Sequence, residues 1–164
     1  MEFLTEISKR LHDGKVVFSL IGGFTASHYG FTHITENVGV CARFTPENLR
    51  RIDSAFKDLH PRHRLTANKF PFELTDELCQ VLKNVYLNTD LGVLDCLSQV
   101  AGVGDFDAIL QKSLLTDFPF GRCYVLKIEA LIQAKRAVGR PLDIEAVRQL
   151  EAIKEKKENQ KELL

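Results

Sequence analysis

The sequence has no excess of either charge, no closely paired cysteines and no long hydrophobic run. Lysine and arginine number 22, as do aspartate and glutamate, so no overall field would attract nucleic acid or an anionic membrane. No apolar stretch approaches the roughly 20 residues of a membrane-spanning helix. Residues 1–13 mix polar and apolar side chains, unlike a secretory signal with its basic start and apolar centre. These absences predict a soluble, cytoplasmic protein.

The four cysteines are widely separated, and none belongs to a C-x-x-C pair: Cys41, Cys79, Cys96 and Cys123. This spacing argues against a zinc site and against a redox pair. Three of the four lie within apolar runs, where free cysteine packs as a small hydrophobe. We expect reduced, buried thiols, because disulfides belong to oxidising compartments.

The length of 164 residues, with 45% hydrophobic and 27% charged residues, is typical of one globular domain. No internal repeat or low-complexity linker divides the chain. We therefore predict a single domain over residues 1–164, in which residues 154–164 form a charged helical extension.

The hydrophobic pattern predicts helices and short strands in mixed order. Helices are expected at residues 2–12, 24–30, 46–59, 105–115 and 128–138, and again from a cap at Asp143 onward. Strands are expected at 15–21, 37–44, 82–88, 92–98 and 123–126, with an edge strand near 70–74. This mixture indicates an α/β fold with a small mixed sheet flanked by helices.

One stretch organises the rest of the chain. An apolar strand ends at Gly22-Gly23, a short helix follows, and a second strand begins at Asn37. Side chains two residues apart on a strand point to the same face, so Asn37 and Gly39 share a face at the start of that strand.

A second pattern lies near the C-terminus, where residues 127–143 read KIEALIQAKRAVGRPLD. The two patterns, in this order, resemble the minimal nucleotidyltransferase superfamily, in the branch of abortive-infection and toxin-type nucleotidyltransferases. The resemblance covers about residues 16–150. It implies a nucleotidyltransferase-like fold with a C-terminal helical segment.

The resemblance also assigns roles to particular residues. Gly22 and Gly23 correspond to the glycine pair at which backbone approaches the nucleotide phosphates. Lys135 and Arg140 correspond to cations expected to face those phosphates, with Asp143 ending the same segment.

In the family, two carboxylates on one strand and a third on its neighbour bind Mg²⁺, which neutralises the reacting phosphates. Asn37 and Gly39 stand at the first two of these positions, and Asp95 stands at the third. Asn37 has lost the charge and Gly39 has no side chain, so Asp95 alone makes a poor Mg²⁺ site. Strand alternation is expected to turn Glu36 to the opposite face.

Each of these residues also has a purely structural interpretation. The glycine pair suits a tight strand-to-helix turn. Asp95 would be costly to bury unpaired, so an ion pair with Lys135 or Arg140 is the alternative to a remnant site. The two cations would otherwise form a solvated face. The basic cluster at residues 60–64 is either a solvated loop or a phosphate contact.

Four hypotheses of function follow. The first is a nucleotidyltransferase-fold protein with lost or reduced transfer, which binds a nucleotide, an RNA or a protein partner, as in a toxin–antitoxin pair. The second is an active enzyme that moves NMP from an NTP to a hydroxyl group and uses Mg²⁺. The third is an inactivated variant that Asn37→Asp with Gly39→Asp would restore. The fourth is an assembly module that makes its contact through the charged C-terminal helix.

Overall fold

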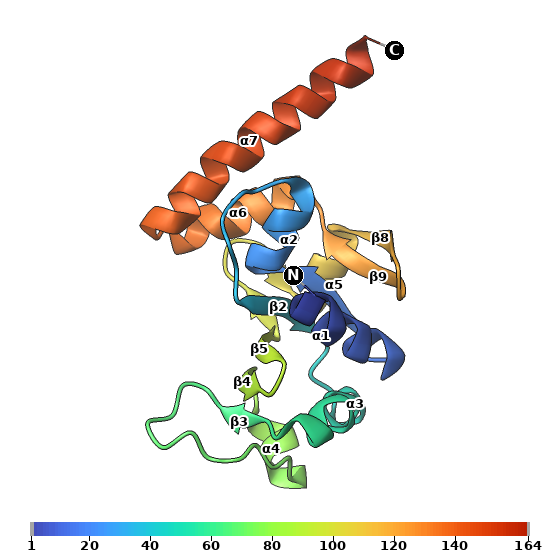
Figure 1. The fold of residues 1–164 in the computed structure, drawn as a ribbon, viewed down its shortest axis with the longest axis vertical. Coiled ribbons are helices and arrows are strands. Elements are labelled where there is room, and N and C mark those ends of the chain that lie inside the picture. Colours follow the sequence, from blue (N-terminus) through green and yellow to red (C-terminus); the bar gives the residue numbers. More distant parts are fainter. Residues whose placement is uncertain (1, 164) are drawn as a thin grey trace.

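A computed structural model of the chain describes residues 2–163. In chain order the elements are α1 (Glu2–Asp13), β1 (Phe18–Ile21), α2 (Gly22–Tyr29), β2 (Asn37–Ala42), α3 (Pro46–Phe56), η1 (Lys57–Leu59), β3 (Arg62–His63), α4 (Asp76–Val81), β4 (Asn84–Thr89), β5 (Gly92–Leu97), β6 (Gln99–Val100), β7 (Gly104–Asp105), α5 (Phe106–Gln111), β8 (Ser113–Phe118), β9 (Gly121–Leu126), α6 (Ile128–Val138) and α7 (Pro141–Glu162) (Figure 1).

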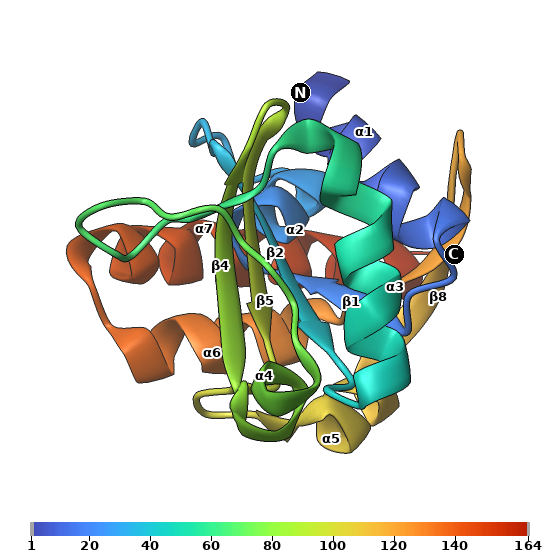
Figure 2. The same ribbon diagram turned by 90° about the horizontal axis from the view of Figure 1, so that it is seen from below.

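The main sheet has seven strands in the order β3-β4-β5-β2-β1-β9-β8. The β1–β9 and β2–β5 pairs are parallel, and the other neighbours in this sheet are antiparallel. The helices lie on both sides of the sheet (Figure 2). The predicted α/β fold with a mixed sheet is therefore confirmed.

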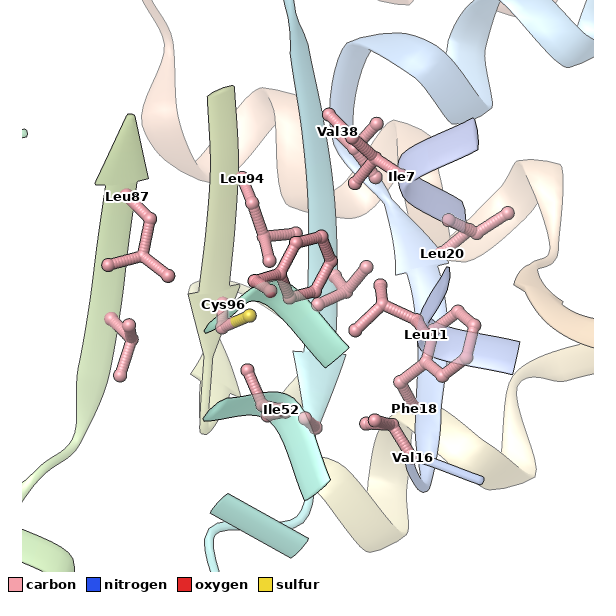
Figure 3. Packing of buried hydrophobic residues seen from close by; sticks show 14 of the residues in the cluster. Ile7, Leu11, Val16, Phe18, Leu20, Val38, Ile52, Leu87, Leu94 and Cys96 are labelled. Carbon is pink, nitrogen blue, oxygen red and sulfur yellow. The ribbon is translucent and has the colours of Figure 1, made fainter. Parts of the chain in front are cut away.

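Strand alternation divides the core between the two faces of the sheet. On one face, Leu20, Val38 and Leu94 pack against Ile7 of α1 and Ile52 of α3 (Figure 3). The other face packs against α5, α6 and α7 through a second buried cluster, which includes Ile21, Cys41, Leu126, Ile109, Leu131 and Leu150. Helices α6 and α7 therefore cover the face opposite to α1 and α3.

The helix boundaries follow from local signals, with one correction. The Thr45 side chain accepts a hydrogen bond from the Asn48 N–H at 3.2 Å, which caps α3 as its Thr-Pro start predicts. For α7, the prediction of Asp143 as the cap is wrong. Arg140 is the N-cap residue, and Asp143 lies three residues later, where its carboxylate accepts from the Arg140 N–H at 3.2 Å. Helix α7 includes the predicted extension as far as Glu162.

The structure also corrects one helix prediction and one strand prediction. The helix expected to reach residue 115 ends at Gln111, and β8 follows as an antiparallel partner of β9. Leu114 and Leu115 are both exposed on this outer strand, so their run of apolar residues is not a helical core face. Near residues 70–74 only an isolated bridge forms, between Arg62 and Pro71, and β3 is the strand at that edge.

All four cysteines are free and buried, as the sequence predicts. Burial raises the pKa of the Cys41 and Cys123 thiols to about 12, so both are protonated at neutral pH. Within residues 2–163, no helix is long and apolar enough to cross a membrane.

Candidate functional site

A cavity of about 870 Å³ opens where β1 ends and β2 begins, and the α6–α7 turn forms its opposite wall. All seven site residues expected from the sequence line it: Gly22, Gly23, Asn37, Gly39, Asp95, Lys135 and Arg140. The loop after β3 projects from the sheet on the same side as the α6–α7 turn (Figures 1 and 2). The cavity lies between the sheet, the helical hairpin and the connection from α2 to β2, and Arg64 is the residue of the loop after β3 that lines it.

Pairing across the strands places the polar residues in one row. Asp95 of β5 is opposite Gly39 of β2 on one side and Tyr86 of β4 on the other. Arg64, directly after β3, continues the row, because its N–H donates to the Tyr86 carbonyl oxygen at 2.9 Å. Residues paired in this way present their side chains on the same face of a sheet. We call Arg64, Tyr86, Asp95 and Gly39 the Asp95 row.

Both oxygens of the Asp95 carboxylate are engaged. Arg64 Nη2 donates to Oδ1 at 2.5 Å, and Asn37 Nδ2 donates to Oδ2 at 3.2 Å. The side chains of Arg64 and Asp95 are 26% and 20% exposed, so the pair is only partly shielded from water. The ion-pair partner of Asp95 is therefore Arg64 rather than Lys135 or Arg140. The only signal in the sequence was the basic density of residues 60–64.

The glycines of the site lie where the backbone segments come close together. Gly22 has a φ of +80°, a conformation that favours glycine. A Cβ on Gly23 would lie 2.8 Å from Thr35 Oγ1, and one on Gly39 would lie 3.1 Å from the Ile21 carbonyl oxygen. A side chain at Gly39 thus requires a small shift of β1 or β2.

A second carboxylate, Asp143, lies on the helical side of the cavity and is 1% exposed. Arg140 Nε donates to it at 2.7 Å, and Lys135 Nζ lies 3.4 Å from its other oxygen. Burial acts to raise the pKa of Asp143, but the hydrogen bond from Arg140 and the charges of Lys135 and Arg140 outweigh burial and lower that pKa. Asp143 is therefore ionised at neutral pH.

The donor set does not fit Mg²⁺. In the described part of the chain, no three histidine, cysteine or acidic side chains gather as a metal site would require. Asp95 has committed both oxygens to nitrogen donors, and positions 37 and 39 supply no carboxylate. Glu36 precedes β2, so the alternation of that strand does not fix its side chain, and it is among the residues that line the cavity.

The remaining wall of the cavity is apolar. It is formed by side chains from the strand ends and from the helical hairpin: Ile21, Leu97, Val100, Leu131, Val138 and Leu142. An apolar wall beside a few fixed polar groups is typical of a small-molecule site. The cavity therefore has a polar end on the sheet, an apolar wall, and a second group of charged side chains, Lys135, Arg140 and Asp143, at the α6–α7 turn.

Comparison with known proteins defines the fold. No protein-family model and no curated protein matches the chain. Among solved structures, the antibiotic-resistance factor ANT(2'')-Ia in solution superposes with a TM-score of 0.58 and 12% identity, over 99% of this chain and 92% of that one. A Thermotoga maritima protein assigned as a nucleotidyltransferase gives 0.54 and 16%, over 89% and 88%. The fold is a nucleotidyltransferase fold.

A crystal structure of ANT(2'')-Ia in complex with adenylyl-2''-tobramycin matches with a TM-score of 0.55, over 98% of this chain and 99% of that chain. The two sequences are again only 12% identical, so the similarity is a similarity of fold. The predicted fold class is therefore confirmed.

Proposed function

We propose that the protein binds a nucleotide in this cavity and has lost, or retains only weakly, metal-dependent nucleotidyl transfer. The proposal rests on the hydrogen bonds that already occupy the Asp95 carboxylate. This remaining carboxylate is held by Arg64 and Asn37, and the two neighbouring ligand positions hold an amide and a glycine.

The shape and polarity of the cavity support a nucleotide as the ligand. Its apolar wall suits a base. Its polar end carries Arg64 and the glycine pair at the start of α2, and Lys135 lies on the helical wall. The structure of ANT(2'')-Ia with an adenylylated compound adds that this architecture accommodates an adenylyl group in that protein. We place the chain in the abortive-infection and toxin-type branch on its order of motifs, with an RNA or protein partner as the wider context.

Calorimetric titration with each of the four NTPs, followed by a transfer assay with labelled NTP and Mg²⁺, tests the proposal. We expect binding of at least one nucleotide without transfer of label to RNA, protein or a small-molecule hydroxyl. Robust Mg²⁺-dependent transfer would contradict it.

Glu36 supports a second candidate, an active nucleotidyltransferase. Glu36 lines the same cavity as Asp95 and could supply a second carboxylate if Arg64 moved aside. In that case Glu36→Gln and Asp95→Asn would each abolish transfer. An unchanged rate in either variant would exclude this candidate.

A further inference from the structure

Arg64 is fixed in the cavity by both its backbone and its side chain. Its N–H is hydrogen-bonded to Tyr86 of β4, and its guanidinium carbon lies 5.5 Å from the centre of the Tyr86 ring. Tyr86 pairs in register with Asp95, so the contacts that hold the guanidinium also aim it at the carboxylate. The sheet itself therefore supports a positive charge at this end of the cavity.

Holding the Arg64 guanidinium in this position costs free energy. In the part of the chain that the structure describes, Arg64 Nε is buried and has no hydrogen-bond partner. A buried donor without an acceptor is unfavourable, and native structures contain few of them. The ion pair with Asp95 uses Nη2 and leaves Nε without an acceptor, and a site that binds anions would benefit from such a donor.

We propose that Arg64 is the resident cation of this site and stands in for the Mg²⁺ ion of an active nucleotidyltransferase. Resting on the proposed function, this inference adds that the nucleotide phosphates are bound without a divalent ion. A guanidinium against Asp95 Oδ1 both occupies the oxygen that a metal would need and repels a second cation.

Arg64 also determines what restoring the missing carboxylates would achieve. Asn37→Asp with Gly39→Asp would return the two lost acidic groups to β2 next to Asp95. With Arg64 still present, its guanidinium would pair with the new carboxylates as well. We therefore expect the double variant to stay metal-free, and removal of Arg64 to be needed before the site accepts a divalent ion.

The first experiment is titration of ATP in EDTA into the unmodified protein, Arg64→Met and Arg62→Met. Arg62 is the matched control, because it is an exposed arginine two residues away that does not line the cavity. Arg64→Met should weaken binding by about tenfold, as expected for loss of a charge-assisted contact, and Arg62→Met should leave it within about twofold. Equal affinities of all three proteins would overturn the inference.

The second experiment needs no nucleotide. Free Mn²⁺ is measured by its electron paramagnetic resonance signal in the presence of Asn37→Asp/Gly39→Asp, with and without Arg64→Met. We expect Mn²⁺ binding in the triple variant alone. Equal Mn²⁺ binding by the double and triple variants, or no binding by the triple variant, would contradict the role of Arg64.

Circular dichroism first shows whether each variant folds, because a Cβ at Gly39 lies only 3.1 Å from a backbone oxygen. If the Gly39 variants do not fold, Asn37→Asp with and without Arg64→Met repeats the comparison. If the unmodified protein binds no nucleotide, the proposed function fails, and the Mn²⁺ comparison still decides the role of Arg64. If nucleotide binds and Arg64→Met has no effect, only the inference fails.

Discussion

Asp95 and Asp143 face the same cavity, and each is neutralised by basic side chains, but the two carboxylates are held in different ways. Asp143 is paired within one helical hairpin, with Arg140 three residues before it and Lys135 eight residues before it. Asp95 is held by residues 31 and 58 positions away in sequence. Asp143 is almost completely buried, whereas Asp95 keeps some contact with water.

This difference indicates a structural role for Asp143 and a binding role for Asp95. Asp143 is fixed at the start of α7 and joins α6 to α7 through Lys135. Asp95 lies at the polar end of the cavity, where Arg64 can exchange its contact with Asp95 for a contact with a ligand. We expect changes at Asp143 to act mainly on stability and changes at Asp95 to act mainly on binding.

The largest effect on stability is expected from Asp143→Ala. This change removes a helix-terminal hydrogen bond and leaves Lys135 without its partner, so the free energy of unfolding should fall by about 3 kcal/mol. Asp95→Ala should lower it by only about 1 kcal/mol, because that pair is partly hydrated. Urea denaturation measures both, with Asp76→Ala, at an 84% exposed carboxylate, as the control. Equal losses at Asp95 and Asp143 would remove the distinction.

The pH dependence of stability should show the same contrast. Because the pKa of Asp143 is lowered in the folded state, its contribution is present above the ordinary value of 3.8 and is lost as pH falls through the folded pKa. The unmodified protein should therefore lose stability in that acid range, and Asp143→Asn should lose less. Denaturation series between neutral pH and about pH 2 check this, and parallel curves would contradict it.

Asp95→Asn should strengthen ATP binding in EDTA. The change removes a negative charge close to the phosphates and frees Arg64, so the affinity should rise about fivefold, equivalent to ~1 kcal/mol. Calorimetry measures the change, and Asp143→Asn serves as the comparison because its partners lie on the helical wall. A loss of affinity in Asp95→Asn would contradict this expectation and indicate that the carboxylate is needed to hold Arg64 in place for the phosphates.

The smallest effects are expected at the two cations of the helical wall. Lys135 contacts Asp143 loosely at 3.4 Å, so it is free to turn to a phosphate, and Lys135→Ala should weaken ATP binding by about threefold. Arg140 Nε is hydrogen-bonded to Asp143 at 2.7 Å, and the Arg140 side chain is 69% exposed. Arg140→Ala should therefore change ATP binding by less than about twofold. The reverse order of the two effects would show that Arg140 is the phosphate ligand.

The sequence predicted the parts of the fold that depend on local signals. The strand that ends at Gly22-Gly23, the helix expected from residue 46 and the helix expected to end at residue 138 are confirmed, with Thr45 capping α3 and Gly139 ending α6. Strand β8 was missed because its exposed leucines continue the apolar run of α5, and only pairing with β9 makes it a strand.

In the site, too, the residues with a local sequence signal were predicted and the residue placed by strand pairing was missed. Asn37, Gly39 and Asp95 were expected to meet, and the parallel pairing of β2 with β5 brings them together. Arg64 has no periodic pattern that links it to Asp95. Its position depends on the register of β3 against β4, which no local sequence signal specifies.

The ATP affinity of the unmodified protein, measured in EDTA and again in Mg²⁺, tests the central claim most directly. If Arg64 is the resident cation, the two affinities should agree within about twofold, because no divalent ion takes part in binding. Binding that appears only with Mg²⁺, or that tightens by more than about tenfold when it is added, would contradict the account.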